Sequence, residues 1–247
     1  MFNTFKQPVI FAHRGACALA PENTITSFEL AVAHQADAVE LDAKLSKDGQ
    51  VMVIHDPTLD RTTDGKGNVN EFTLAELKKL DAGSKFDPKF TGEKIPTLEE
   101  VFEHVGKKLF VNVELTNYSS SRDDLIQQVA EVVKRQNMQQ RVLFSSFLPK
   151  NLVKMKTLIP EAPVAILCLP GLPGAYARSV FMHKVSPAIV HPYLANVNAS
   201  YVRKEHGRGR RVHVWTVNSE NDLKRMLQLQ VDGIFTDDPQ KARNLMS

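Results

Sequence analysis

Two cysteines are all that the 247 residues contain, and this scarcity excludes whole classes of protein. Cys17 and Cys168 are too few for a disulfide framework, and they lack the C-x-x-C spacing of a zinc or redox motif. They are compatible with a reducing compartment, and the segment before His13 holds no apolar run of signal-peptide length. We therefore expect a cytoplasmic protein.

The sequence also has no long apolar run free of helix breakers. Its longest uncharged stretch, 162–177, is interrupted by proline or glycine at positions 163, 170, 171, 173 and 174. A membrane-spanning helix needs about 20 mostly apolar residues, and prolines inside it would break its hydrogen bonding. We therefore expect no stable insertion into a membrane.

A large excess of one charge is absent too. The chain has 31 basic and 28 acidic residues, a net charge of +3, which is too balanced to predict a nucleic-acid partner. Arg208, Arg210 and Arg211 form the only dense basic group in the sequence. Because they fall between a predicted helix and a predicted strand, we interpret them as a solvated loop rather than a binding site.

Short apolar or β-branched runs alternate with amphipathic stretches along most of the chain. Alternation of this kind predicts parallel strands joined by helical crossovers. The predicted strands are 9–12, 38–45, 109–115, 142–147, 164–169, 188–192, 212–217 and 233–236. Helix starts are predicted at Asn23, at Thr97 with Glu100 three residues later, and at Ser219.

Eight such units predict an α/β fold of the (β/α)8, or TIM barrel, type, for which 247 residues is a typical length. The alternative is an open, doubly wound sheet. That fold usually has a glycine-rich first turn, which the segment 13–15 (His-Arg-Gly) is not. We prefer the barrel and interpret residues 1–247 as one domain.

One segment interrupts the alternation. After a short strand at 51–55, a predicted insertion at 56–96 precedes the next helix. Within it, Leu74, Leu77 and Leu80 have the spacing of a short amphipathic helix. In a barrel the insertion would lie on the catalytic face, where the strand-to-helix loops build the site.

Three acids are predicted to converge inside this barrel. Side chains alternate along a strand, so Glu40, Asp42 and Lys44 share one face of their strand. On another predicted strand, Glu114 shares a face with Asn112 and Thr116. Buried together, carboxylates raise one another's pKa unless they share protons or a cation. Oxygen ligands favour Mg²⁺, Ca²⁺ or Mn²⁺. The alternative is a salt-bridge network with Lys44 or Arg14.

Two histidines end predicted strands. His13 and His55 lie at carboxyl ends, where barrel enzymes keep their catalytic groups. Two imidazoles there suit general acid and base roles near neutral pH, although each alone would be a structural residue or a metal ligand. Arg14 follows His13 directly, and its guanidinium fork matches a pair of phosphate oxygens.

Several motifs run in order along nearly the whole chain. They are HRG at 13–15, PENT at 21–24, ADAVELD at 36–42, DG at 48–49, VIHD at 53–56, RTT at 61–63, IPTLEE at 95–100, NVE at 112–114, VWTVN at 214–218 and DGIFTDDP at 232–239. Together these motifs resemble the glycerophosphodiester phosphodiesterase family. So many ordered matches are far more specific than any single motif.

The resemblance implies a (β/α)8 barrel, a catalytic divalent ion, and hydrolysis of a small-molecule glycerophosphodiester to glycerol 3-phosphate and an alcohol. The implied roles are His13 and His55 as the acid–base pair, Arg14 as a phosphate contact, Glu40, Asp42 and Glu114 as metal ligands, and Trp215 as part of the pocket wall. The sequence does not assign acid and base between the two histidines. It also leaves open whether water or the glycerol hydroxyl attacks first.

The chain departs from the family pattern at one position. Many relatives have a lysine two residues after the glutamate of the third predicted strand, where this chain has Thr116. We hypothesise that Lys44, on the inward face of the second predicted strand, partly replaces that cation in substrate binding. The alternative is that Thr116 itself hydrogen-bonds phosphate or water.

Other activities remain open at this level. The apolar segment 169–174 would follow the fifth predicted parallel strand on the catalytic face, either as a packing loop or as a contact for a lysophospholipid chain. The latter would make the enzyme lysophospholipase D-like. A phospholipase C-like cleavage on the other side of the phosphate is a further alternative. A non-catalytic binding protein would be expected to have lost a histidine or an acid, and this chain keeps all five. The oligomeric state is not predicted.

Overall fold

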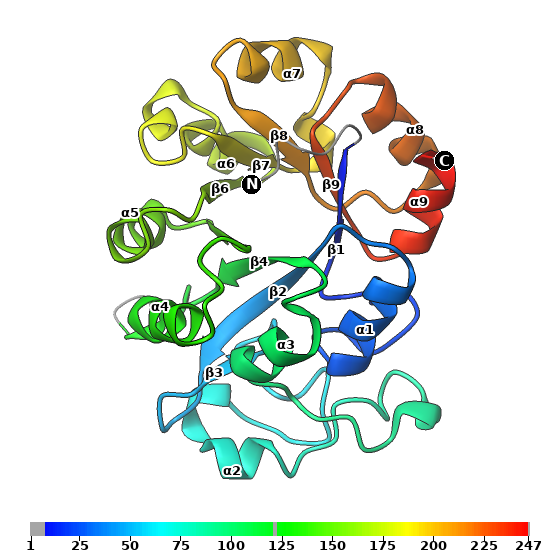
Figure 1. The fold of residues 1–247 in the computed structure, drawn as a ribbon, viewed down its shortest axis with the longest axis vertical. Helices are drawn as coiled ribbons and strands as arrows, with labels where there is room; N and C mark the ends of the chain where they lie inside the picture. The colour runs from blue at the N-terminus through cyan, green and yellow to red at the C-terminus, as the bar shows by residue number, and fades with distance from the viewer. Residues whose placement is uncertain (1–7, 121–122, 247) are drawn as a thin grey trace.

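The computed structural model describes residues 8–120 and 123–246, and its strands form a ring surrounded by helices (Figure 1). The strands are β1 (Val9–Ala12), β2 (Ala38–Leu45), β3 (Val51–Val53), β4 (Phe110–Leu115), β5 (Val142–Ser146), β6 (Val164–Cys168), β7 (Ile189–Pro192), β8 (Arg211–Val214) and β9 (Gly233–Thr236). The α-helices are α1 (Ile25–Ala33), α2 (Leu74–Leu77), α3 (Leu98–Val105), α4 (Leu125–Arg135), α5 (Pro149–Leu158), α6 (Gly171–Ala177), α7 (Ala199–His206), α8 (Glu220–Gln228) and α9 (Pro239–Met246). Short 3₁₀ helices are η2 (Val69–Glu71), η3 (Pro88–Phe90), η4 (Val180–His183) and η5 (Leu194–Asn196).

The sheet closes into a barrel. β1 pairs in parallel with β2 on one side and with β9 on the other, and the remaining neighbours follow chain order. Among the strands of the described residues, only β3 is antiparallel, and it pairs with the end of β2. The (β/α)8 prediction is therefore confirmed, and the open-sheet alternative is wrong. Each predicted parallel strand is present with ends shifted by at most a few residues.

Helix starts agree with the sequence at two of the three predicted positions. The side chains of Thr97 and Ser219 accept hydrogen bonds from the third residue beyond them, at the starts of α3 and α8. Asn23 is not a cap, because Thr24 caps α1 and accepts from the backbone N–H of Ser27. Asn23 instead adopts a left-handed φ of 57° and directs its side chain toward the barrel.

The interior of the barrel changes from apolar to polar along β2. One layer is apolar and includes Phe11, Ala38 and Phe235, all buried. Two and four residues beyond Ala38 on the same face of β2 are Glu40 and Asp42, also buried. The acids therefore lie next to this apolar layer, toward the carboxyl end of the barrel strands.

The basic group at 208–211 is not simply solvated. Arg210 is fully buried and its Nη1 donates to Glu205 Oε2 at 3.0 Å. Arg208 donates to the other oxygen of the same carboxylate at 3.1 Å. The solvated-loop interpretation is therefore wrong for Arg210, because its partner acid lies on α7, a contact that the linear pattern does not display.

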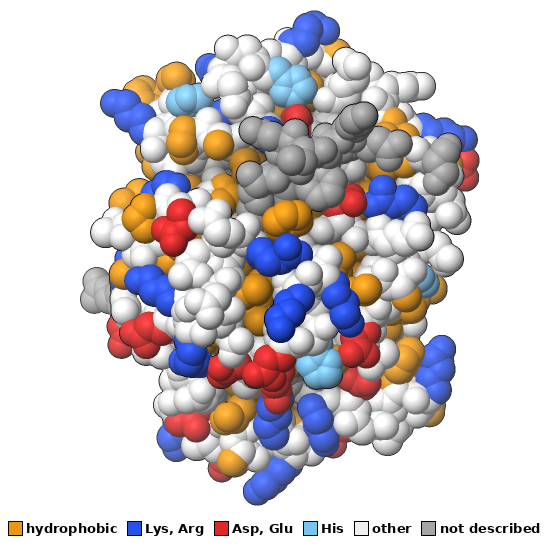
Figure 2. Space-filling view, in the orientation of Figure 1, with side chains coloured by type: hydrophobic (Ala, Val, Ile, Leu, Met, Phe, Trp, Pro, Cys, Tyr) orange, Lys and Arg blue, Asp and Glu red, His pale blue; other side chains and the backbone are white. Residues whose placement is uncertain are grey.

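The segment 56–96, coloured cyan to green in Figure 1, lies beside β3 at one edge of the molecule. It contains α2, so the predicted helix is confirmed for Leu74 and Leu77, whereas Leu80 lies beyond its end. Leu77 packs in a small apolar cluster with Met52 and Ile95. No helix in the described part of the chain combines the length and apolarity needed to cross a bilayer. On the face drawn in Figure 2, basic side chains are interspersed with acidic ones.

Candidate active site

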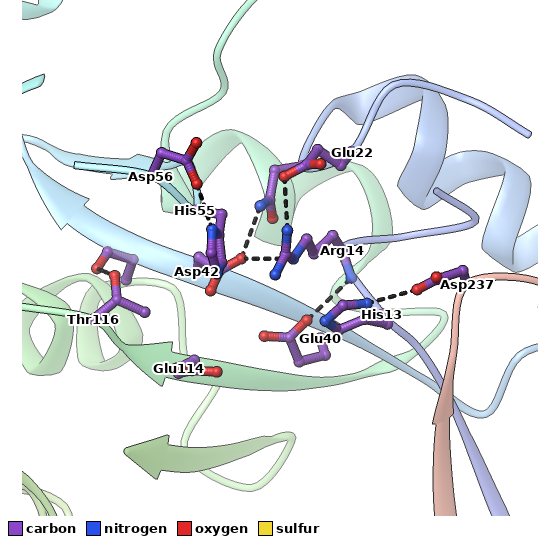
Figure 3. Close-up of polar contacts among 12 residues, drawn as sticks. His13, Arg14, Glu22, Glu40, Asp42, His55, Asp56, Glu114, Thr116 and Asp237 are labelled. Atoms are coloured by element: carbon purple, nitrogen blue, oxygen red, sulfur yellow. Dashed lines mark hydrogen bonds and ion pairs between the residues drawn. The ribbon is translucent and has the colours of Figure 1, made fainter. Parts of the chain in front are cut away.

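The register of neighbouring strands brings the three predicted acids together. Asp42 of β2 is paired with Glu114 of β4, and Glu40 lies two residues earlier on the same face of β2. Oxygen atoms of the three carboxylates lie within 4.8 Å of one another. Figure 3 shows them on adjacent strands.

Burial sets the electrostatics of this cluster. Desolvation, followed by repulsion from Asp42 and Glu114, raises the pKa of Glu40 well above its ordinary value. Desolvation and the Asp42 charge raise the pKa of Glu114 to about 8, opposed by a hydrogen bond from Tyr118. The carboxylates therefore favour protons or a cation among them.

The topology also explains how each histidine is held. His13 and Asp237 directly follow Ala12 and Thr236, which are partners in the β1–β9 ladder, so the two side chains meet. His13 Nδ1 lies 2.7 Å from Asp237 Oδ1. His55 Nδ1 lies 2.6 Å from Oδ1 of the next residue, Asp56.

These aspartates fix the imidazoles in the same way. A carboxylate only accepts, so each histidine presents its proton at Nδ1 and leaves Nε2 for other partners. Burial would raise the pKa of Asp237, but the bond from His13 and its charge outweigh that effect and lower the pKa. The pKa of Asp56 is lowered chiefly by its hydrogen bond to Arg61.

A chain of ion pairs links the two sides of the site, and Figure 3 shows its part around Arg14. Arg14 Nη1 lies 3.0 Å from Glu22 Oε1, and Arg14 Nε lies 3.5 Å from Asp42 Oδ2. Arg61 joins Glu22 to Asp56 with bonds of 2.6 and 2.7 Å. The predicted alternative, a salt bridge between an acid and Arg14, is thus present at Asp42, alongside the raised pKa values of the other two acids.

The turn after β1 allows Arg14 to reach these partners. Gly15 has a φ of +84°, and a Cβ there would overlap Ser27 on α1. Arg14 has a φ of 55°, and its backbone N–H donates to Glu40 Oε2 at 3.0 Å. Only glycine fits at position 15, because any other side chain would meet Ser27 and would strain the backbone.

A cavity of about 80 Å³ lies between the two histidines and the acidic cluster. Most of the predicted site residues line it, namely His13, Arg14, Glu40, His55, Glu114 and Trp215. Asn112, Ser145, Phe147, Leu167, His191 and Phe235 complete the wall. A larger cavity of about 380 Å³, bordered by Gln139, Lys156 and Arg211 among others, contains none of the predicted residues.

Lys44 and Thr116 lie together but outside the 80 Å³ cavity. Lys44 Nζ donates to Thr116 Oγ1 at 2.7 Å and to Thr116 O at 3.1 Å. Burial lowers the pKa of Lys44, although Asp42 and Glu114 act against this. Both residues line a neighbouring cavity of about 370 Å³. The structure therefore does not bring either residue into the wall of the cavity that His13 and His55 line.

Sequence reasoning assigned no role to several residues that support the site. Asp56 and Asp237 hold the histidines, and Glu22 with Arg61 connects the ion pairs. Asn23 Nδ2 donates to Asp42 Oδ2 at 2.9 Å. All of these residues lie in the segments that resemble the family, so the resemblance could have identified them as candidate site residues.

Known proteins resemble this chain over nearly its full length. The sequence profile described as "Glycerophosphoryl diester phosphodiesterase family" matches residues 13–241. A glycerophosphodiester phosphodiesterase of Caldanaerobacter subterraneus subsp. tengcongensis is 41% identical over 239 residues, which cover 96% of this chain and 97% of the relative.

Solved structures give the same result. A phosphodiesterase of Oleispira antarctica, in complex with its product sn-glycerol-3-phosphate, matches with a TM-score of 0.90 and 33% identity, covering 97% of each chain. A glycerophosphodiester phosphodiesterase of Agrobacterium tumefaciens matches with a TM-score of 0.84 and 29% identity, covering 96% of this chain and 100% of the other.

Proposed function

Because the chain belongs to the glycerophosphoryl diester phosphodiesterase family, we propose that it hydrolyses small glycerophosphodiesters to sn-glycerol 3-phosphate and an alcohol. It is a phosphoric diester hydrolase. One observation carries the proposal, which is that three clustered acids and two aspartate-held histidines meet at the carboxyl ends of the barrel strands. A cytoplasmic location, expected from the sequence, belongs to the same proposal.

The donor set fits a hard divalent cation. Glu40, Asp42 and Glu114 offer only oxygen atoms, these lie within 4.8 Å of one another, and two of the acids have raised pKa values. These three residues would hold Mg²⁺, Ca²⁺ or Mn²⁺. When bound, such an ion neutralises charge on the phosphoryl oxygens.

His13 and His55 form the acid–base pair. Each keeps a proton on Nδ1, shared with its aspartate, so proton transfer takes place at Nε2. The histidine with a free Nε2 lone pair removes a proton from the nucleophile. The other, protonated at Nε2, donates to the departing alkoxide, which would otherwise be a poor leaving group at neutral pH.

Arg14 supplies a fixed positive charge to the cavity. Its guanidinium is held by Glu22 and Asp42, so it is oriented before substrate arrives. A planar guanidinium aimed at a phosphate stabilises the charge that builds up in the transition state.

The first experiment measures glycerol 3-phosphate released from glycerophosphocholine by metal-stripped protein before and after Mg²⁺, Ca²⁺ or Mn²⁺ is added. We expect release only with an ion, and loss of that release in Glu40→Gln. Glu29→Gln, which changes a half-exposed acid on α1 that pairs with His104, is the matched control and should keep full activity. Release without an ion would contradict the proposed metal requirement. Absence of release with every ion would contradict the proposed reaction.

A lysolipid substrate is the second candidate, and one observation favours it. The segment 169–174 is no packing loop, because most of it belongs to α6 and Leu172 is 89% exposed. Tyr176 and Phe181 nearby are 62% and 70% exposed. Such a patch after β6 is suited to contact with an acyl chain. Release of choline from lysophosphatidylcholine tests this candidate. Identifying which product carries the phosphate distinguishes this reaction from phospholipase C-like cleavage on the other side of the phosphate.

A further inference from the structure

A second group of side chains that can bind a metal lies beside the acidic cluster. His13, Cys17 and Asp237 offer one nitrogen, one sulfur and one oxygen atom, and these three atoms lie within 4.8 Å of one another. In Figure 3, Asp237 lies on the opposite side of His13 from Glu40 and Glu114. The group is therefore distinct from the acidic cluster, although it includes a histidine of the proposed acid–base pair.

The fold positions Cys17 for this contact. Its two neighbours in the turn after β1, Ala16 and Ala18, donate their backbone N–H groups to Ser27 O and Asp237 O, each at 3.0 Å. The second of these bonds ties the turn directly to the residue that follows β9. The thiol is therefore held near the carboxylate before any ion binds.

The atoms of this group suit a different ion from the acidic cluster. The acidic cluster offers only oxygen, which is the preference of Mg²⁺, Ca²⁺ and Mn²⁺. A set of one imidazole, one thiolate and one carboxylate suits Zn²⁺, which binds all three ligand types in tetrahedral sites. The thiolate of Cys17 and the carboxylate of Asp237 would together balance the two charges of the ion.

In the structure, two hydrogen bonds converge on the carboxylate of Asp237. One comes from His13 Nδ1, 2.7 Å from Oδ1, and the other comes from the Cys17 thiol. Burial, followed by the charge of Asp237, raises the pKa of this thiol. The thiol therefore stays protonated at neutral pH and reacts poorly with oxidants, whereas a cation that binds beside it would stabilise the thiolate.

An ion can reach this group without unfolding of the chain. The side chains of His13 and Asp237 are 21% and 31% exposed, and Cys17 lines a cavity of about 230 Å³ with Glu22 and Phe86 among its other residues. Bonds of about 2.0 Å to nitrogen and oxygen at a tetrahedral angle place these two atoms about 3.3 Å apart. His13 and Asp237 therefore need to separate by only roughly half an ångström.

We propose that His13, Cys17 and Asp237 form an inhibitory site for Zn²⁺. The ion binds His13 Nδ1, Cys17 Sγ and a carboxylate oxygen of Asp237, and a water molecule completes the tetrahedron. The thiol proton is released to solvent, and the imidazole proton passes through solvent from Nδ1 to Nε2.

Zinc bound in this way blocks either role of His13 in the acid–base pair. Its Nε2 has no lone pair left to accept a proton, and it donates its proton only by becoming an imidazolate anion. The loss of activity therefore rests on the proposed function of His13, whereas the binding of zinc does not.

Binding is tested with Co²⁺ as a spectroscopic probe, because a bond from Co²⁺ to a thiolate absorbs in the near ultraviolet and bonds to carboxylates do not. We expect this band in metal-stripped protein to which Co²⁺ is added, its displacement by Zn²⁺, and its loss in Cys17→Ser. Cys168→Ala, which removes the buried cysteine of β6, is the matched control and should keep the band. Absence of the band in the unaltered protein, or its persistence in Cys17→Ser, would overturn the metal site.

Inhibition is measured separately, as release of glycerol 3-phosphate at a saturating concentration of the activating ion and increasing Zn²⁺. Each rate is compared with the zinc-free rate of the same variant. Loss of a supporting residue weakens metal binding by about 10- to 100-fold, so loss of a ligand should raise the zinc concentration for half inhibition at least about 10-fold in Cys17→Ser. The value for Cys168→Ala should equal that of the unaltered protein.

Equal inhibition of Cys17→Ser and the unaltered protein would show that zinc acts elsewhere, such as at the acidic cluster, and would overturn the inhibitory role. If the unaltered protein releases no glycerol 3-phosphate with any activating ion, the proposed phosphodiesterase activity fails. The Co²⁺ band then still decides whether the three residues bind a metal.

Discussion

Asp237 and Asp56 each accept a hydrogen bond from Nδ1 of a histidine, and neither aspartate is among the residues that line the 80 Å³ cavity. Their effect on catalysis is therefore exerted through the imidazoles. Replacing Asp237 by Asn keeps the shape but offers an N–H donor to Nδ1, which favours the tautomer with its proton on Nε2. That tautomer has no lone pair at Nε2 to accept a proton.

We accordingly expect Asp237→Asn to lower kcat by on the order of 10²–10⁴, with little change in KM. Steady-state kinetics on glycerophosphocholine measures this. Asp238→Asn is the matched control, because Asp238 accepts from the backbone N–H of Lys241 and has no contact with His13. A normal kcat in Asp237→Asn would show that the orientation of His13 does not depend on this bond.

At the scale of residues, the sequence identified the candidate catalytic and metal-binding side chains better than the residues that hold them in place. Glu40 and Asp42 could be placed on one face by strand alternation alone. Asp237 could not be paired with His13, because the two are 224 positions apart and meet only through the β1–β9 register. The role of Lys44 in substrate binding stays a prediction, since its ammonium donates to Thr116 and both residues line the neighbouring cavity.

At the scale of elements, local signals predicted α3 closely. Thr97 and Glu100 form a reciprocal capping box, and Glu100 also accepts from Lys78, which ties the insertion to the barrel. We expect Thr97→Ala to lower the free energy of unfolding by about 1 kcal/mol with no change in kcat. Urea denaturation measures the loss, and Thr91→Ala at the exposed end of η3 is the control. An unchanged unfolding midpoint would contradict the importance of this cap.

The connection from α7 to β8 illustrates what local signals miss. Three closely spaced arginines suggested a solvated loop, yet Glu205 and Arg210 are both fully buried and paired at 3.0 Å. Burial of a charge pair depends on the elements that pack over it, and a sequence pattern gives no measure of that packing.

We expect Arg210→Met to lower the free energy of unfolding by about 3–5 kcal/mol, because it leaves a buried carboxylate with a weaker set of partners. The double variant Glu205→Leu with Arg210→Met removes both charges and should recover most of that loss. Arg208→Met, at a half-buried position, is the control and should cost less. Equal losses in the single and double variants would mean that packing, rather than charge, determines the effect.

At the scale of the whole molecule, the barrel could be predicted because its evidence is repeated in every unit of the chain, so errors of a residue or two at strand ends do not alter the topology. Closure of the same barrel brings the acids together, and their burial and mutual repulsion disfavour their charged forms. Burial raises the pKa of Glu114 to about 8, from an ordinary value of 4.5, and raises that of Glu40 in the same direction.

A raised folded-state pKa makes stability depend on pH in a definite direction. The folded protein binds more protons than the unfolded chain between about pH 4.5 and pH 8, so stability that is present below that range is lost as the pH rises through it. We expect the Tm of metal-stripped protein to fall over this range, and to fall less in Glu114→Gln, whose side chain does not titrate.

A divalent ion should reverse this trend, because it binds the deprotonated carboxylates of the folded state and stabilises that state by mass action. Saturating Mg²⁺, Ca²⁺ or Mn²⁺ should therefore raise the Tm more at pH 8 than at pH 5, and should have little effect on Glu114→Gln at either pH. Thermal unfolding followed by circular dichroism measures all four conditions without any substrate. Parallel Tm curves for the unaltered protein and Glu114→Gln, with and without ion, would mean that the three acids do not act as one charged cluster.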